Sequence, residues 1–311
     1  MNTPEIILHH YDASPFSQKA LKMLAAKGLA WRSVVMPMIA PKPDLVALTG
    51  GYRGTPVLQL GADIYVDTIR IAAELEARFP SRPLFPGGSQ GLMMTLTPWA
   101  DHFFEAGLHM AIHDLEASWD DAFRADRAAV FERLDFSEVK SQFAEACASL
   151  RAEAALIDQQ LSDGRGYLLG EEPSLADIHA WPVFWFTRAA IPATSALLAG
   201  FENLPAWEAR MAGLGEGQRL EATAAEAHGV ARGSTPQSSP SPTPAIDPAD
   251  PLGLKSGESV AVEPRSSKRG GSKGKLIGLD PKEITIEVTS PEAGRTHVHF
   301  PRHGYSVKRA G

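Results

Sequence analysis

The spacing of apolar and polar residues divides the chain into stretches with different expected secondary structure. In residues 1–85, short β-rich runs alternate with one-sided helical patterns, and the first helical pattern ends at Gly28. The expected elements are strands at residues 5–10, 31–38, 55–60 and 63–66 and helices at residues 18–27 and 68–78. This order predicts a small mixed α/β domain with helices packed on its sheet.

A Pro- and Gly-rich connector then leads into a stretch in which apolar residues recur only at helical spacing. Residues 92–228 are therefore predicted to form an all-helical domain. Its expected helices lie at residues 92–119, 137–161, 174–188 and 204–228. Residues 229–251 are dominated by Pro, Ser, Thr and Gly, which cannot bury enough apolar surface to order themselves, so this segment is predicted to be a linker.

Alternation of apolar and polar residues begins after the linker. Five short β patterns separated by turn residues predict a small all-β module at residues 252–311, an SH3-like barrel. Residues 251–311 carry 11 Lys and Arg against 6 Asp and Glu, so their net charge is +5 while the rest of the chain holds −12. Such a basic module can bind a protein or nucleic-acid partner, or dock on its own acidic body. The candidates for nucleic-acid contact are Arg265, Lys268, Arg269, Lys273 and Lys275.

Composition narrows the class of protein. The apolar fraction of 44% and the charged fraction of 22% are ordinary for globular domains. No stretch reaches the ~20 apolar residues of a membrane helix, and the first residues lack the basic and apolar regions of a secretory signal, so a cytoplasmic location without membrane attachment is expected. Cys147 is the only cysteine, which excludes an intramolecular disulfide.

The first candidate for chemistry is Ser14, which follows the first expected strand and precedes Pro15 at the start of a helix. A hydroxyl there lies beside free backbone amides and the positive end of the helix dipole, and it can donate a hydrogen bond that stabilises a thiolate. The alternative is that Ser14 only caps the helix, which serine does well.

Two further elements follow in the same domain. Pro56 precedes a strand, where it is either an ordinary edge residue or, with a cis bond to Thr55, part of a turn that presents the backbone of Thr55 to an extended ligand. Asp67 and Thr68 end the hairpin and begin a helix, where free amides would bind an α-carboxylate and Asp67 could bind an α-amino group. Thr68 is equally expected as the cap of that helix.

The order of these elements resembles the glutathione transferases, and the plant tau and omega-like classes most closely. The segment SPFSQKALKMLAAKGLAW resembles their active-site loop and first helix, and RGTPVLQLGADIYVDTIRIAAELE is similar to their cis-proline, hairpin and acidic-Ser/Thr pair. GYLLGEEPSLADIHAWPVF is similar to the family's capping box, with Ser174 and Asp177 at the start of a buried helix. The resemblance covers about residues 5–215, and it implies a thioredoxin-like first domain followed by the family's all-α C-terminal domain.

The resemblance also implies a role for each candidate residue. Ser14 takes the position of the activating residue, and because it is not cysteine, thiolate exchange through an enzyme cysteine is not expected. Tyr11 is a reserve candidate for contact with the same sulfur, its alternative being a ring packed at the strand end. The implied glutathione-binding residues are Arg53 near the glycyl carboxylate, Thr55 and cis-Pro56 at the cysteinyl part, and Asp67 with Thr68 at the γ-glutamyl end.

A row of possible metal ligands lies on one face of the helix expected at residues 92–119. No general-base motif such as HExxH accompanies the row, and the resembled fold places this helix at the cleft or the dimer interface, so no metal is expected. The residues of the row are His102, Glu105, His109 and His113. The same helix carries three aromatic candidates for an apolar second-substrate site, Trp99, Phe103 and Phe104.

Two functions are compatible with these patterns. The first is a homodimeric glutathione transferase that takes glutathione as co-substrate and adds its thiolate to an apolar electrophile. The second is a non-catalytic transferase-like platform whose C-terminal β-module recruits a protein or nucleic-acid partner. The second hypothesis rests on the extra C-terminal residues, because a chain ended near residue 230 would already complete the resembled fold.

Overall fold

The computed structural model of the chain describes residues 5–131, 135–237, 245–265 and 270–310. They form two compact units. The first unit comprises residues 1–20, 30–80 and 218–311, and the second comprises residues 21–29 and 81–217, so that helix α1 (Pro15–Lys27) contributes to both. None of the helices in the described part of the chain is long and apolar enough to cross a membrane.

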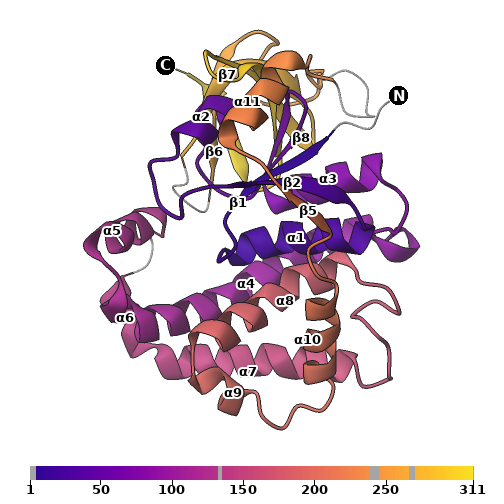
Figure 1. The fold of residues 1–311 in the computed structure, drawn as a ribbon, viewed down its shortest axis with the longest axis vertical. Helices are drawn as coiled ribbons and strands as arrows, with labels where there is room; N and C mark the ends of the chain where they lie inside the picture. Colours follow the sequence, from indigo (N-terminus) through magenta and orange to yellow (C-terminus); the bar gives the residue numbers. More distant parts are fainter. Residues whose placement is uncertain (1–4, 132–134, 238–244, 266–269, 311) are drawn as a thin grey trace. The chain divides into compact units, whose positions relative to one another are not determined.

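One ten-stranded sheet forms the centre of the first unit, with strands from both ends of the chain in it (Figure 1). The strand order is β10-β6-β7-β8-β9-β4-β3-β1-β2-β5. The strands of one half are β1 (Ile6–His10), β2 (Ala30–Val35), β3 (Val57–Leu60), β4 (Asp63–Val66) and β5 (Gln218–Glu221). The other half is formed by β6 (Ser259–Pro264), β7 (Ser272–Leu279), β8 (Glu283–Ser290), β9 (Gly294–Pro301) and β10 (Tyr305–Arg309).

Three helices pack on this sheet: α2 (Pro43–Thr49), α3 (Thr68–Arg78) and α11 (Ala224–Gly233). The predicted α/β arrangement of the N-terminal part is confirmed, and α3 has the predicted bounds. The expectation of an all-β C-terminal extension is also confirmed, because β6 to β10 pair antiparallel with one another. Closure of these strands into a barrel stays a prediction.

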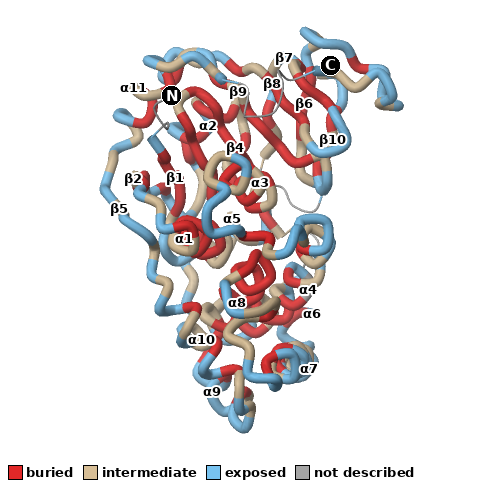
Figure 2. The backbone as a smooth tube through the Cα atoms, turned by 90° about the vertical axis from the view of Figure 1, so that its right-hand side faces the viewer, coloured by how far each residue is buried: buried red, intermediate tan, exposed pale blue. Residues whose placement is uncertain are grey.

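The extension, which is residues 252–311, joins the N-terminal strands through a parallel pair of β4 and β9. Tyr65 of β4 lies opposite His299 of β9 in this register. Every residue of β1 and of β4 is buried, so these two strands are covered on both faces (Figure 2).

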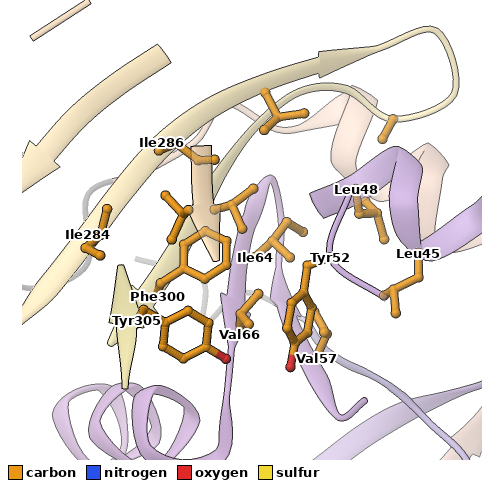
Figure 3. Close-up of a cluster of buried hydrophobic side chains, with 14 of the residues drawn as sticks. Leu45, Leu48, Tyr52, Val57, Ile64, Val66, Ile284, Ile286, Phe300 and Tyr305 are labelled. Carbon is orange, nitrogen blue, oxygen red and sulfur yellow. The ribbon is translucent and has the colours of Figure 1, made fainter. Parts of the chain in front are cut away.

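Both halves of the sheet contribute to one hydrophobic core. Figure 3 shows this cluster, in which Ile284, Phe300 and Tyr305 of the extension lie together with N-terminal residues such as Val57 and Val66. Burial of large apolar side chains is the main stabilising contribution to folding, at about 1.5–3 kcal/mol for each. The extension therefore shares the core of the N-terminal strands.

Two segments differ from the sequence expectation. The predicted helix over residues 204–228 is wrong at residues 214–223, because α10 (Leu204–Gly213) ends at a glycine-rich turn and β5 follows before α11 begins. Gly215 and Gly217 have φ values of 69° and 76°, which a continuing helix cannot contain. The region predicted as a linker holds the end of α11, and its residues 238–244 lie outside the described residues.

The second unit is helical, as predicted for residues 92–228 up to the end of α10. Its long helix α4 packs against α7, α8 and α6, and α10 packs against α7 and α8. The remaining helices have the bounds α4 (Gln90–Leu115), α5 (Asp121–Val130), α6 (Phe136–Ser141), α7 (Phe143–Gln160), α8 (Leu175–Ala190) and α9 (Ala193–Leu197), with 3-10 turns at Pro86–Gly88 and Glu116–Ser118.

Candidate functional site

Three segments of the first unit meet the sheet at one edge, which brings most of the candidate residues together. In the register of the sheet, His9 of β1 lies opposite Val57 of β3, and Val57 lies opposite Val66 of β4. The segments attached at this edge are residues 11–14 after β1, residues 55–56 before β3 and residues 67–68 after β4. These segments are called the sheet-edge site below.

Ser14 lies at the start of α1 and is only 2% exposed. Its Oγ accepts a hydrogen bond from the backbone N of Ser17 at 3.2 Å, so the serine caps the helix. This bond uses a lone pair of the hydroxyl and not its O–H. Capping is therefore compatible with donation to a thiolate beside the free amides of the first turn.

Two histidines end β1 directly before this loop. Nε2 of His9 lies 2.8 Å from Oε1 of Gln59, and Nε2 of His10 lies 2.9 Å from Oγ of Ser33. Burial lowers the pKa of each imidazole to about 4, because a low-dielectric environment disfavours the charged form. Both rings are neutral near pH 7, so neither of them supplies a cation to stabilise a thiolate.

Tyr11, the reserve candidate, is half-buried in the loop after β1. Nζ of the buried Lys42 lies 5.2 Å from the centroid of its ring. A cation over an aromatic face is attracted by the negative potential of the ring. This contact gives the ring a packing role at the strand end.

The Thr55–Pro56 peptide bond is cis, the isomer that the resemblance implies. Thr55 and Pro56 are buried, whereas Arg53 is half-buried. Gly54 lies so close to the ring of Tyr52 that a Cβ at this position would come within 3.0 Å of the phenol oxygen. The close approach requires glycine, and it fixes the turn that carries Arg53 and Thr55.

Asp67 has φ 79° and ψ 141°, a conformation that residues other than glycine rarely adopt. Its Oδ1 accepts a hydrogen bond from the backbone N of Ile69 at 3.0 Å. The cap of α3 is thus Asp67, and the expectation that Thr68 caps this helix is wrong, because Thr68 is its first helical residue. A helix N-terminus beside an acidic side chain can bind the carboxylate and the ammonium group of an amino acid.

One residue reaches this site from the other end of the chain. Oη of Tyr305, at the start of β10, donates a hydrogen bond to Oδ2 of Asp67 at 3.2 Å. The two residues are 238 positions apart. Sequence reasoning missed Tyr305 because it is an ordinary apolar position in an alternating strand pattern, and no local signal marks its partner.

The loop after α2 also contacts the extension. The backbone N of Lys273 donates to the carbonyl of Gly50 at 3.0 Å. Gly51 has φ 138°, and a Cβ there would collide with the carbonyl oxygen of Gly271. A Cβ at Gly270 would in turn come within 3.0 Å of the carbonyl oxygen of Gly51, so the close approach of the two backbones depends on glycine on both sides.

A buried polar network joins the extension to β4 and α3. His299, 1% exposed, has Nε2 3.0 Å from Oδ1 of Asp63 and Nδ1 2.5 Å from Oε1 of Glu283. Oε2 of Glu283 lies 2.7 Å from Nε of Arg70. Desolvation lowers the pKa of His299, but hydrogen bonds with the two carboxylates outweigh it and raise this pKa overall. Desolvation acts to raise the pKa of Glu283, yet His299 and Arg70 lower it to about 2.

In the second unit, Ser174 and Asp177 form the capping box of α8. The backbone N and Oγ of Ser174 donate to Oδ2 of Asp177 at 2.9 and 2.6 Å. Oδ1 of Asp177 accepts from the backbone N of Leu168 at 2.8 Å and from Nε1 of Trp207 at 2.9 Å. These bonds satisfy a fully buried carboxylate, which is a structural role.

The aromatic candidates of α4 differ in their environment. Nε1 of Trp99 donates to Oε2 of Glu153 at 2.8 Å, and Trp99 is half-buried. Phe103 is buried, with its ring centroid 5.7 Å from that of Phe184. Phe103 therefore belongs to the helical core. For Trp99 and the half-buried Phe104, a role in an apolar second-substrate site stays a prediction.

The possible metal ligands of α4 do not gather in the described part of the chain, in which no group of three or more His, Cys, Asp or Glu could hold a metal ion. The side chain of His102 is not among those described. His113 stacks on Phe143 with ring centroids 3.9 Å apart, and its Nδ1 lies 2.7 Å from Oδ1 of Asp114.

The predicted nucleic-acid contacts lie in the extension. Arg265, Lys273 and Lys275 are exposed. Lys268 and Arg269 lie outside the described residues. The three described side chains do not on their own outline a nucleic-acid interface.

Comparisons with known proteins agree with the arrangement described above. Two family models match the chain, the glutathione S-transferase N-terminal domain at residues 8–83 and the glutathione S-transferase C-terminal domain at residues 116–210. The crystal structure of a GST-like protein from Pseudomonas syringae is 34% identical, with a TM-score of 0.79, over 99% of this chain and 100% of that chain. The chain belongs to the glutathione S-transferase family. A comparison with curated proteins found no match.

Other solved structures cover a smaller part of this chain. The tau-class enzyme of mango, Mangifera indica, covers 67% of this chain and 88% of its own, with 14% identity and a TM-score of 0.50. The beta-etherase of Sphingobium sp. covers 66% and 94%, with 19% identity and a TM-score of 0.50. These two likenesses show the fold alone. The similarity to the Pseudomonas protein, in contrast, includes the C-terminal extension of this chain.

Proposed function

We propose that this protein binds glutathione at the sheet-edge site and adds the glutathione thiolate to an apolar electrophile. The observation that carries the proposal is the backbone conformation of Asp67. Its unfavourable backbone conformation, at the start of α3, is of the kind that proteins keep at ligand sites, where the surroundings fix it. Membership of the glutathione S-transferase family gives the ligand its identity.

Each part of glutathione has a chemical counterpart in the site. The carboxylate of Asp67 would bind the α-ammonium group, and the first amides of α3, at Thr68, would bind the α-carboxylate. The backbone of Thr55, before cis-Pro56, would pair with the cysteinyl residue as a strand pairs with its neighbour. Arg53 would bind the glycyl carboxylate.

Ser14 would act on the sulfur. Its O–H donates to the thiolate and the amides of α1 add a favourable potential, so the thiol loses its proton to solvent at a lower pH than in water. The thiolate then forms the S–C bond, and the leaving group of the electrophile departs with the electron pair of the broken bond.

The protein is further proposed to act as a cytoplasmic homodimer, because members of its family commonly dimerise. Light scattering coupled to size-exclusion chromatography would measure a mass near twice the 33.4 kDa of one chain. A monomeric mass at micromolar concentration would contradict the dimer.

Calorimetric titration with glutathione tests the binding proposal. The wild-type chain is expected to bind, and Asp67→Asn, which keeps an acceptor for the Ile69 amide but removes the charge, should weaken binding about tenfold or more. Arg78→Lys is the control, because Arg78 also lies in this unit but bonds to Tyr65 and Glu74. Absence of binding by the wild type would contradict the proposal.

A non-catalytic platform is the second candidate, and the near-complete burial of Ser14 favours it. In that case glutathione would bind without conjugation to a chloroaromatic substrate. The extension would then serve a protein or nucleic-acid partner, and binding of short single-stranded RNA or DNA at low salt, weakening steeply as salt rises, would identify the nucleic-acid case.

A further inference from the structure

The packing of β10 requires an aromatic ring at position 305 but does not require the hydroxyl of Tyr305. Its ring is 3% exposed and lies 5.5 Å from the ring of Phe300, inside the shared core. Gly304, with φ 81°, precedes it at the turn into β10, and Tyr305 lies opposite Pro264 of β6. A phenylalanine would fill the same apolar space, so the hydroxyl is the group that needs an explanation.

The hydroxyl contacts Asp67, the acidic side chain at the start of α3 in the sheet-edge site. Its 3.2 Å bond to Oδ2 complements the 3.0 Å bond from the Ile69 amide to Oδ1, so each carboxylate oxygen of Asp67 has a donor and the plane of the group is set. A carboxylate offers about four acceptor positions, so it can accept an ammonium group in addition to these two donors.

The chemistry of the donor matters as much as its position. A lysine or arginine at this place would neutralise the carboxylate and compete with a cationic ligand. A phenol is uncharged below its ordinary pKa of about 10, so it can orient Asp67 without adding a positive charge of its own. A carboxylate held in a fixed orientation is what a ligand ammonium group requires.

We propose that Tyr305 is a positioning residue of the glutathione site, through which the C-terminal extension prepares Asp67 to bind the α-ammonium group. The proposal rests on the proposed glutathione binding. It assigns the extension a part in recognising the γ-glutamyl end of the ligand. Tyr305 acts on the ligand only through Asp67, so its effect should depend on the α-amino group.

A comparison of two ligands on two proteins tests this dependence. Calorimetry of wild type and Tyr305→Phe would use glutathione and its desamino analogue, glutaryl-cysteinylglycine, which lacks the α-amino group. We expect Tyr305→Phe to weaken glutathione about tenfold, as for loss of a hydrogen bond to a charged group, and to change the analogue less than twofold. Equal weakening of both ligands, or of neither, would overturn the proposal.

Two further arms keep the result interpretable. In the Asp67→Asn background, Tyr305→Phe should no longer discriminate between the ligands, and a discrimination that persists there would also overturn the proposal. This arm still applies if Tyr305→Phe alone folds poorly, because Asp67→Asn on its own should bring the two ligands to similar affinity.

If wild type binds neither ligand, the proposed glutathione binding has failed and this inference falls with it. The wild-type titration separates that outcome from a failure of Tyr305 alone.

Discussion

His299 and Asp63 lie 3.0 Å apart, Nε2 to Oδ1, where the extension joins the N-terminal half of the sheet. The imidazole also contacts Glu283 of β8, so one buried side chain bridges two carboxylates from distant parts of the sequence. A buried ion pair of this kind adds little when compared with a well-packed apolar pair, but removal of one partner leaves an uncompensated charge. The junction is therefore sensitive to single substitutions.

His299→Gln is expected to destabilise the protein by about 3–5 kcal/mol, because it leaves the buried carboxylate of Asp63 without its cation and Glu283 with Arg70 alone. Denaturant unfolding would measure the change. His297→Gln is the matched control, since it is two residues away on the same strand and its Nε2 lies 3.8 Å from Oε2 of Glu287. If both variants unfold at the same denaturant concentration, the bridge does not stabilise the junction.

The contribution of His299 should depend on pH. Its pKa is raised in the folded state, so its stabilisation is fully present below the ordinary 6.5 and is lost as pH rises through the folded value. Glu283, with its pKa lowered to about 2, contributes above 4.5 and loses its contribution as pH falls toward 2. The difference in unfolding free energy between wild type and His299→Gln should thus be largest between pH 4.5 and 6.5.

The difference in unfolding free energy between the two proteins is the quantity to measure, because other histidines change the stability with pH in the opposite direction. His9 and His10 have pKa values lowered to about 4, so they destabilise the fold as pH falls below 6.5 in both proteins. A difference that grows as pH rises from 6.5 to 9 would contradict the charge assigned to His299.

Gly51→Ala tests the close approach of the loop after α2 to the extension. The added Cβ would collide with the carbonyl oxygen of Gly271, at a φ of 138° that already disfavours alanine, so we expect a loss of about 2–4 kcal/mol. Gly170→Ala is the matched control, with φ 136° and no heavy atom within 4 Å. It isolates the cost of the backbone conformation, and an equal loss in the two variants would show that the contact itself is unimportant.

Truncation after Pro251 tests whether the extension stabilises the sheet. Removal of the extension would expose core residues of the N-terminal half, Val57, Ile64 and Val66 among them, so several kcal/mol of stability should be lost. Circular dichroism during denaturant unfolding would record the change. Wild-type stability and wild-type glutathione affinity in the truncated chain would show that the extension is neither a structural nor a functional part of the unit.

Sequence patterns predicted those helices and strands whose formation depends on residues close together in the chain. The alternation over residues 259–307 predicted the five C-terminal strands, and α3 begins at Thr68 as expected. The short helix α2 was not predicted, because its seven residues between Pro43 and the Gly50–Gly51 pair carry little periodic signal. The helix expected to run to residue 228 was wrong because β5 gains its partner, β2, from far away in the chain.

The candidate site likewise contains residues that the local sequence identifies and contacts that it does not. Ser14, the Thr55–Pro56 pair and Asp67 stand at loop and helix starts that local rules identify. The contact of Asp67 with Tyr305, and that of Asp63 with His299, depend on the pairing of β4 with β9. Such pairings are set by long-range burial and register, which a period of two along one strand does not encode.

The pKa of the thiol of bound glutathione tests the central claim most directly. Ultraviolet absorbance of the thiolate would be followed against pH in wild type, Ser14→Ala and Ser17→Ala, a control that removes a neighbouring buried hydroxyl and keeps the Ser14 cap. Thermal unfolding of each protein would measure the loss of stability, about 1 kcal/mol, that removal of the Ser14 cap is expected to cause. We expect a thiol pKa of about 7 in wild type and Ser17→Ala, and a return toward about 8.5 in Ser14→Ala. The same pKa in all three proteins would contradict the role of Ser14 in thiolate stabilisation.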